Sequence, residues 1–340
     1  MPINHRIVLD NRPQGEATVN NFKMVELPLP DLKDGEVLVC HHYLSLDPYM
    51  RGRMNESKSY AQPQPLGEVM IGGTVGEVVD SRHPKFKAGD QVVGMGGWQE
   101  YSVVDANVVG ALRKVDTTHV PLSHYLGAVG MPGVTAWYGL VKIIAPKAGE
   151  TVTVSAASGA VGSAYGALAK ARGCRVVGIA GGKDKCDYVV NELGFDACID
   201  YKAGPGAVRA GLKEHCPKGV DIYFDNVGGE ILDDVLARIN RKARIIICGA
   251  ISQYNNTTAV QGPKNYLSLL VNRARMEGIV VFDYADRYHL AVAEMAGYIK
   301  DGRMKSKEDV VVGLQTFPET LLKLFNGENF GKLVLEVAKL

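Results

Sequence analysis

Residues 151–171 read TVTVSAASGAVGSAYGALAKA, and this stretch decides the fold. Thr151–Ser155 is a short run rich in β-branched residues, which predicts a strand. Val161–Ala171 is rich in small residues, which suit a helix packed closely against its surroundings. The glycine-containing stretch between them must carry the chain from strand to helix within a few residues. A strand, a tight turn and a helix in this order are typical of nucleotide-binding proteins.

The turn follows the pattern G-x-G-x-x-G, with Ala157, Gly159 and Gly162 at the three glycine positions. The first position makes the tight turn, the second lets the backbone approach a pyrophosphate, and the third allows the helix to pack closely on the strand. The helix N-terminus then presents free N–H groups to phosphate. An ordinary glycine-rich corner would contain similar residues, but the strand before and the helix after it favour a nucleotide site.

The end of the next strand distinguishes the two nicotinamide cofactors. An NAD site usually has an acidic residue about 20 positions further on, which bonds the ribose 2′-hydroxyl. Here Gly181 and Gly182 occupy that position, followed by Lys183 and Lys185. Two lysines suit a 2′-phosphate, although they also fit a solvated loop, and Asp184 between them is able to face a ribose. We predict NADP(H) as the cofactor.

The middle of the chain alternates strand-like and helix-like segments. Beyond the first unit, strands are predicted at Arg175–Ile179, Val220–Asp225, Ala243–Cys248 and Met276–Phe282, and helices at Lys185–Leu193 and Glu230–Ile239. Such alternation is typical of a parallel sheet covered by helices.

Both ends of the chain show a different pattern, in which short predicted strands are separated by glycines. Strands are predicted at Val37–Leu46, Ile71–Val79, Asp90–Met95, Trp98–Val104, Val310–Leu314 and Leu333–Val337, with a helix near Glu319–Phe325. The third and fourth of these strands are expected to form a hairpin around Gly96-Gly97. Short strands with glycine-rich turns favour a barrel or a partly open sheet.

The length and composition of the chain limit the classes of function that it can have. A chain of 340 residues exceeds what one hydrophobic core usually serves, so two domains are expected. The net charge of +1 argues against a surface built for nucleic acid. Its six cysteines are scattered without C-x-x-C spacing, which disfavours disulfides and structural zinc. The start of the chain lacks an apolar signal core, and no apolar run is long enough to span a membrane, so a cytoplasmic protein is expected.

Several strings across the whole chain carry a family resemblance. They are LDPYMRG (46–52), GMPGVTA (130–136), ASGAVG (157–162), FDNVGG (224–229), CGAISQYN (248–255), RMEG (275–278) and NFGK (329–332). With them the chain resembles the zinc-free medium-chain dehydrogenase/reductases. Within that family it is most similar to the leukotriene B4 12-hydroxydehydrogenase/prostaglandin reductase branch, which includes plant alkenal double-bond reductases and bacterial curcumin reductase.

The resemblance implies the architecture. We expect an α/β protein in which a Rossmann-type, doubly wound parallel sheet is inserted into a β-rich, GroES-like catalytic domain. Residues 1–122 and 302–340 would form the catalytic domain, and residues 123–301 the dinucleotide-binding domain. The strand at Leu333–Val337 would complete the first domain. A homodimer is also implied, with Met276–Phe282 as an edge strand suited to pairing across two subunits.

The resemblance also assigns cofactor contacts by position. Gly159, Ala160, Val161 and Gly162 would hold the pyrophosphate, and Lys185 would meet the 2′-phosphate beside Tyr201. The Lys185–Tyr201 spacing is one residue longer than in the family, which weakens the match at Tyr201. The ribose and nicotinamide would be lined by Asn226, Cys248, Gly249, Ala250, Ile251, Ser252, Tyr254, Ile279, Val280, Val281 and Asn329.

The sequence departs from the zinc-containing relatives of this family. Their early cysteine ligand, their Gly-His-Glu string and their four-cysteine lobe are all missing. Cys40-His41-His42 is the only cluster of ligand-type residues, and adjacent strand residues point to opposite faces of a sheet. No metal site is therefore predicted.

The implied activity is an NADPH-dependent reduction of the carbon–carbon double bond of α,β-unsaturated aldehydes and ketones. Hydride adds to the β-carbon, and charge develops on the carbonyl oxygen, where a hydrogen-bond donor is needed. Tyr49 is the first candidate donor, and Tyr254 is a second candidate catalytic residue. Met131, Thr135 and Tyr266 join Tyr49 as candidate substrate contacts, with small apolar conjugated carbonyl compounds as the expected substrates. All three tyrosines would also fit ordinary packing or loop positions.

Two other functions fit the same motifs. One is an NADPH quinone reductase of the same superfamily, which the cofactor motif does not distinguish from an enone reductase. The other is a non-catalytic NADPH-binding protein, which would hold the cofactor without oxidising it.

Overall fold

The computed structural model describes residues 3–337 and divides the chain into two compact units. The first unit comprises the chain up to Leu126, residues 308–329 and the segment from Leu333 onward. The second unit comprises Gly127–Lys307 together with residues 330–332. The breaks after Leu126 and Lys307 lie a few residues beyond the boundaries expected from the sequence.

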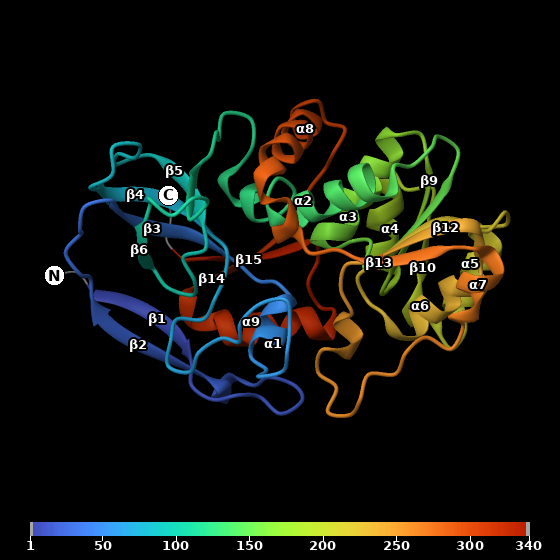
Figure 1. The fold of residues 1–340 in the computed structure, drawn as a ribbon, viewed down its shortest axis with the longest axis horizontal. Coiled ribbons are helices and arrows are strands. Elements are labelled where there is room, and N and C mark those ends of the chain that lie inside the picture. The colour runs from blue at the N-terminus through green and yellow to red at the C-terminus, as the bar shows by residue number, and fades with distance from the viewer. Residues whose placement is uncertain (1–2, 338–340) are drawn as a thin grey trace. The chain divides into compact units, whose positions relative to one another are not determined.

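The second unit is built on a parallel sheet of six strands in the order β10-β9-β8-β11-β12-β13 (Figure 1). The strands are β8 (Thr151–Ser155), β9 (Arg175–Ala180), β10 (Ala197–Asp200), β11 (Val220–Asp225), β12 (Ile239–Ile247) and β13 (Arg275–Gly278). The order reverses direction at β8, the strand that leads into the glycine-containing turn. Ligands in such sheets bind outside the carboxyl ends of the strands at this reversal.

Helices connect these strands in chain order. They are α3 (Ala160–Ala171), α4 (Lys183–Asn191), α5 (Ala207–His215), α6 (Gly229–Leu236) and α7 (Leu267–Asn272). Because crossovers between parallel strands are right-handed, α3 and α4 cover one face, and α5, α6 and α7 cover the other. Two further helices belong to this unit, α2 (Met131–Trp137) and α8 (Tyr288–Lys300), and Trp137 Nε1 donates a hydrogen bond of 2.6 Å to Glu294.

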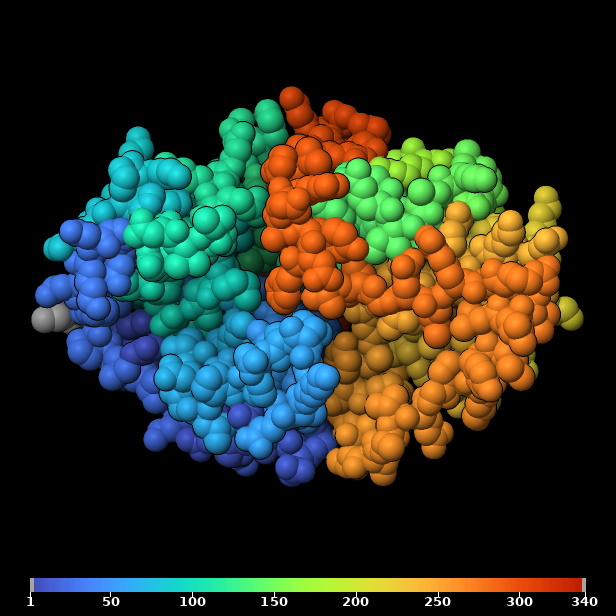
Figure 2. Space-filling model, viewed as in Figure 1, coloured from blue at the N-terminus to red at the C-terminus, as the bar shows by residue number. Residues whose placement is uncertain are grey.

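At one end of the sheet, β13 is an edge strand, and among the described strands it pairs with β12 alone. The chain before it, residues 255–274, lies at the surface of the second unit, in orange in Figure 2. Leu270 and Val271 on α7 are 74% and 66% exposed. This end of the sheet therefore combines an open strand edge with exposed apolar side chains.

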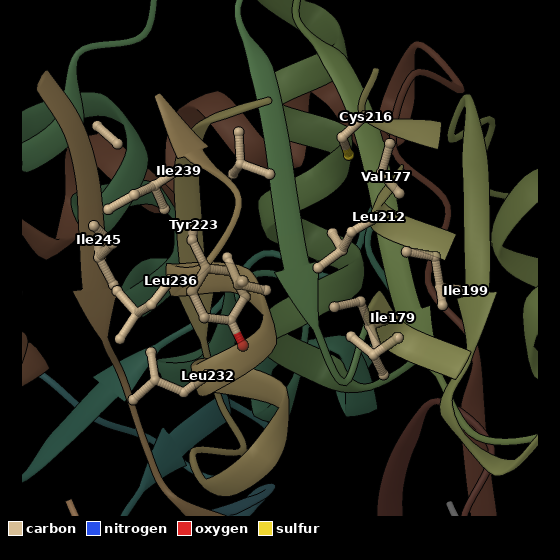
Figure 3. Packing of buried hydrophobic residues seen from close by; sticks show 14 of the residues in the cluster. Val177, Ile179, Ile199, Leu212, Cys216, Tyr223, Leu232, Leu236, Ile239 and Ile245 are labelled. Carbon is tan, nitrogen blue, oxygen red and sulfur yellow. The ribbon is translucent and has the colours of Figure 1, made fainter. Parts of the chain in front are cut away.

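The core on the α5, α6 and α7 face contains alternate residues of the strands (Figure 3). Ile179 of β9, Ile199 of β10 and Tyr223 of β11 point into it, where Leu212 of α5 and Leu236 of α6 meet them. All five side chains are at most 4% exposed. Because side chains alternate along a strand, the residues next to them point toward α3 and α4.

The first unit contains a seven-membered sheet ordered β14-β15-β3-β4-β5-β7, with β6 also paired to β3. These strands are β3 (Glu36–Ser45), β4 (Thr74–Ser81), β5 (Gln91–Gly94), β6 (Tyr101–Asp105), β7 (Leu112–Lys114), β14 (Glu308–Val312) and β15 (Lys332–Glu336). A separate hairpin joins β1 (Ile3–Leu9) to β2 (Phe22–Pro28), and the helices α1 (Tyr49–Arg53) and α9 (Phe317–Asn326) complete the unit.

The last described strand returns to the first unit. β15 pairs antiparallel with β3, with Leu335 opposite Leu44. The expected fold class is confirmed: a Rossmann-type parallel sheet is combined with a mixed sheet made from both ends of the chain.

The hairpin expected around Gly96-Gly97 is wrong. β5 pairs with β4 and β7, whereas β6 pairs with β3. The reason lies in Trp98, which is fully buried and stacks on Phe317 with ring centroids 3.6 Å apart. Its backbone bonds Ile7 and Met70 in place of a hairpin partner, so the chain crosses to another strand.

Three strand boundaries also differ from expectation. The strand expected at Met276–Phe282 ends at Gly278, and a 3₁₀ segment begins at Val281. Ile239, expected as the end of a helix, instead begins β12. The strand expected at Ile71–Val79 begins only at Thr74.

Candidate active site and cofactor site

The glycine-containing turn follows β8 directly. Ala156 adopts a left-handed conformation with φ of 49°, and Gly159 N–H donates to the Ala156 carbonyl at 2.9 Å. The sequence assigned the tight turn to Ala157, but Ala157 is fully buried, and its N–H bonds the Ile179 carbonyl at 3.0 Å. Ala156 therefore takes the strained backbone angle, one residue earlier than expected.

Gly162 allows α3 to lie against the turn. A Cβ atom at this position would come within 2.3 Å of the Ala156 carbonyl oxygen, a distance that no side chain tolerates. The helix begins after Gly159, which provides no side-chain cap. The first N–H groups of a helix have no partner within the helix, so they are available to a phosphate. The shape of the turn therefore suits a pyrophosphate, and the N–H groups at the start of α3 are able to donate hydrogen bonds to it.

The end of β9 has a backbone that only glycine adopts easily. Gly182 has φ of 94°, and its N–H donates to Asp200 Oδ1 at 2.7 Å. Asp200 also accepts a hydrogen bond from Lys202 N–H. A Cβ on Gly181 would come within 2.8 Å of the Tyr201 ring, so this ring lies directly over the glycine.

The two lysines of α4 have different surroundings. The Lys183 side chain is 82% exposed and forms an ion pair with Asp187 one turn along the helix. Lys185 is half-buried, whereas Asp184 is exposed. Lys183 therefore occupies a solvated position on the helix surface, which is one of the alternatives that the sequence left open. Lys185 lies closer to the body of the unit.

A buried carboxylate at the end of β11 organises the carboxyl edge of the sheet. Asp225 is fully buried, and its Oδ1 accepts hydrogen bonds from Ser155 Oγ at 3.1 Å and Tyr223 OH at 2.8 Å. The N–H groups of Val227 and Gly228 also donate to Oδ1, both at 3.0 Å. Burial raises the pKa of Asp225, and these four donors oppose that effect.

Sequence reasoning missed Asp225, although it lies in the FDNVGG string (224–229) that carries the family resemblance. Its signal was available, because a carboxylate at the carboxyl end of a predicted parallel strand lies where ligands bind. The next residue, Asn226, donates from Nδ2 to the Ser155 carbonyl at 2.8 Å. Asp225 and Asn226 together fix the ends of β8 and β11 to each other.

The loop after β12 is attached to the loop after β11. Cys248 N–H donates to the Asp225 carbonyl, Ile251 N–H to the Asn226 carbonyl and Ser252 N–H to the Val227 carbonyl. The residues assigned to the ribose and nicotinamide in this loop are thus brought beside Asn226. Burial raises the pKa of Cys248 to about 12, so this thiol stays protonated at neutral pH.

Tyr254 folds back onto its own loop. Its hydroxyl accepts a hydrogen bond of 3.2 Å from Ala250 N–H, and a Cβ on Gly249 would lie 3.0 Å from the same oxygen. The phenol therefore supports the shape of the loop.

The remaining candidates in the second unit differ in exposure. After β13, Ile279 and Val281 are buried and Val280 is half-buried. Thr135 is buried, and its hydroxyl donates to the Met131 carbonyl at 2.8 Å.

Met131 itself is half-exposed, and Tyr266 is 58% exposed at the start of α7. Of these substrate candidates, Met131 and Tyr266 have side chains open to a ligand, and Thr135 is held by its own helix.

Tyr49 and Asn329 belong to the first unit. Tyr49 begins α1, and its hydroxyl is buried without a hydrogen-bond partner among the described residues. Burial, together with the nearby Asp47, raises the pKa of Tyr49 far above its ordinary value. The phenol is neutral at any physiological pH and holds one unused O–H donor.

In the Cys40-His41-His42 cluster, the central histidine has a structural role. His41 is fully buried, with Nδ1 bonded to the Gln99 carbonyl at 2.9 Å and Nε2 to Ser102 Oγ at 2.8 Å. Burial lowers its pKa to about 4, so the ring is neutral. Within residues 3–337, no group of three or more His, Cys, Asp or Glu side chains is arranged to hold a metal ion.

Comparison with known proteins places this geometry in a family. Residues 5–112 match the family described as the N-terminal domain of oxidoreductase, and residues 160–297 match the family described as zinc-binding dehydrogenase. The NADPH-dependent curcumin reductase of Escherichia coli K12 is 43% identical over 98% of this chain and 97% of its own length. The NADP(+)-dependent 2-alkenal reductase of Nicotiana tabacum is 42% identical over 99% and 98%.

The crystal structure of CurA in complex with NADPH from Vibrio vulnificus matches 99% of this chain and 100% of that chain, with a TM-score of 0.92 and 43% identity. The chain belongs to the zinc-free medium-chain dehydrogenase/reductases, in their curcumin and alkenal reductase branch. It is an NADP-dependent oxidoreductase, and the prediction of NADP(H) as the cofactor is confirmed. None of the helices within residues 3–337 has the length and apolarity needed to cross a membrane.

Replacing Gly162 with alanine should prevent α3 from packing on the turn. The added Cβ meets a backbone carbonyl, which has no freedom to move aside, so NADPH binding should weaken at least tenfold and the melting temperature should fall. Gly297→Ala is the matched control, since a Cβ there on helix α8 meets nothing within 4 Å. Fluorescence titration with NADPH and thermal melting test both, and equal behaviour of the two variants would contradict the close-packing role.

Proposed function

We propose that this protein reduces the carbon–carbon double bond of α,β-unsaturated aldehydes and ketones. When bound, NADPH supplies the hydride, which adds at the β-carbon of the substrate, and a proton then adds at the α-carbon. The proposal is supported chiefly by the buried, unpartnered hydroxyl of Tyr49. A neutral phenol at this position is able to donate a hydrogen bond to the carbonyl oxygen as negative charge develops there.

From the family resemblance we infer further roles for the candidate residues. Gly159, Ala160, Val161 and Gly162 hold the pyrophosphate, and Lys185 with Tyr201 holds the 2′-phosphate end. Asn226, residues 248–252, Tyr254, residues 279–281 and Asn329 line the ribose and nicotinamide. Tyr254 acts by shaping its loop, and Met131, Thr135 and Tyr266 border the substrate together with Tyr49.

In this proposal the first unit is the GroES-like catalytic domain and the second is the dinucleotide-binding domain. The hydroxyl of Tyr49 acts on the substrate oxygen, while Asp225 acts through the loops that it holds. The substrates are small apolar conjugated carbonyl compounds, because Met131 and Tyr266 offer apolar and aromatic surface.

Oxidation of NADPH against a panel of acceptors tests the reaction. We expect turnover of a 2-alkenal and an aryl enone with NADPH, and little with a quinone, a saturated aldehyde or NADH. Activity confined to the quinone would replace the proposal with quinone reduction. NADPH binding without turnover of any acceptor would indicate a non-catalytic binding protein.

Tyr49→Phe should lower kcat for the enone by about 100-fold, the usual cost of removing one donor to a developing oxyanion. NADPH affinity should stay unchanged, because the substitution removes only the hydroxyl. Stopped-flow measurement of NADPH oxidation separates the two quantities. An unchanged kcat would assign Tyr49 to packing alone.

Lys185→Ala should weaken NADPH binding by roughly 1–3 kcal/mol, the scale of a lost hydrogen bond to a charged group. NADH binding should hardly change, since NADH has no 2′-phosphate. Lys183→Ala, which removes an exposed lysine already paired with Asp187, is the control and should leave both affinities nearly unchanged. Equal losses for NADPH and NADH in Lys185→Ala would reject the 2′-phosphate role.

We also propose a homodimer in which a second copy of the chain covers β13 and α7. The open strand edge and the exposed Leu270 and Val271 support this assembly. Light scattering should give twice the chain mass, and Leu270→Glu should give a monomer. Leu290→Glu, on the exposed surface of α8, should remain dimeric. A monomeric wild type would remove the proposal.

A further inference from the structure

Two of the six cysteines lie side by side at the adenosine end of the cofactor site. Cys186 is on α4 and Cys198 is on β10. The Cys198 S–H donates a hydrogen bond to the Cys186 sulfur, and both thiols are reduced and half-buried. Neither thiol has a part in the reaction proposed above.

The alternation of β10 explains why Cys198 faces α4. Ile199 points to the opposite face of the sheet, into the core beside Leu212 in Figure 3. Its neighbours Cys198 and Asp200 must therefore point toward α4. Asp200 confirms this direction, because its carboxylate accepts a hydrogen bond from Gly182 N–H immediately before the helix.

A glycine in the neighbouring strand brings α4 close to the sheet. Gly178 of β9 lies opposite Cys198 in the strand register. A Cβ on Gly178 would come within 2.9 Å of Val189 Cγ1, one turn along α4 from Cys186. The absence of a side chain at Gly178 thus lets the helix approach until the two sulfurs meet.

We propose that Cys186 and Cys198 are an oxidation site, and that a reversible disulfide between them lowers the affinity for NADPH. The effect on affinity rests on the proposed role of Lys185, which directly precedes Cys186. Formation of the disulfide rests only on the position of the two sulfurs.

The chemistry requires a two-electron oxidant, for which hydrogen peroxide suffices. The Cys186 thiolate attacks one peroxide oxygen, which gives a sulfenic acid and water after protonation of the leaving hydroxide. The Cys198 sulfur then attacks the Cys186 sulfur and displaces a second water, so two thiols are oxidised and one peroxide is reduced. The hydrogen bond from Cys198 lowers the pKa of Cys186, which makes Cys186 the attacking thiolate.

The disulfide would change the geometry of the first turns of α4. Bonded sulfurs lie about 2.05 Å apart, well inside the separation of hydrogen-bonded thiols. Closing that gap draws α4 toward β10 at Cys186 and moves the adjacent Lys185. With Lys185 displaced from the 2′-phosphate, the protein would discriminate less between NADPH and NADH.

Peroxide treatment of the whole protein, followed by peptide mapping without reductant, tests the site. Trypsin leaves both cysteines in residues 186–202, whereas additional cleavage after Glu192 separates them. We expect residues 186–192 and 193–202 to remain joined after the double digestion and to separate on adding dithiothreitol. Two separate peptides after peroxide would overturn the proposal.

Binding measurements on the same samples test the consequence. Oxidised protein should bind NADPH at least fivefold more weakly than reduced protein, bind NADH equally well, and recover with dithiothreitol. Cys186→Ser and Cys198→Ser should each abolish this response, while Cys40→Ser, which removes a half-buried cysteine of the first unit, should retain it. A mapped disulfide with unchanged NADPH affinity would overturn the regulatory part of the proposal. Both readouts are made without an acceptor substrate, so failure of the enone reductase activity remains a separate result.

Discussion

The carboxylate of Asp225 is the interaction on which the cofactor edge of the second unit depends. One oxygen accepts hydrogen bonds from Ser155 of β8, from Tyr223 of its own strand and from two N–H groups of the following turn. Charge-assisted hydrogen bonds of this kind are stronger than neutral ones, and each donor left without an acceptor in a buried site costs free energy. The loops that would surround the cofactor are therefore fixed before any ligand binds.

The turn after β8 is shaped by its backbone. Ala156 takes the left-handed angle, and Gly162 leaves room for its carbonyl, so the helix start lies directly over the end of β8. The backbone supplies both the shape and the donors for a phosphate. In the proposed cofactor site, side chains would supply selectivity at the far end, where Gly181 and Gly182 leave space and α4 carries Lys183 and Lys185.

Much of this arrangement was predictable from local sequence. The run Thr151–Ser155 and the small residues after it predicted β8 and α3 to within a residue, because β-branched and small residues have strong local preferences. The false hairpin at Gly96-Gly97 shows the limit, since Trp98 is drawn into a core formed with Phe317 from the other end of the chain. The Cys186–Cys198 contact was missed because it depends on how α4 packs on β10 and has no spacing pattern, whereas Asp225 was missed although its place at the carboxyl end of a predicted strand was a signal.

The two units differ in how they present polar groups to a ligand. In the second unit several polar groups near the proposed cofactor site are engaged in hydrogen bonds, as with Asp225 Oδ1, the Thr135 hydroxyl and the Tyr254 hydroxyl, whereas the buried Asp225 Oδ2 has no partner among the described residues. In the first unit the Tyr49 hydroxyl is buried and has no partner among the described residues. A buried O–H without an acceptor destabilises the folded protein, which is an arrangement expected where a ligand atom completes the hydrogen bond. In the proposed reaction, the hydrogen-bonded loops would orient the cofactor, and the Tyr49 hydroxyl would supply the oxyanion contact.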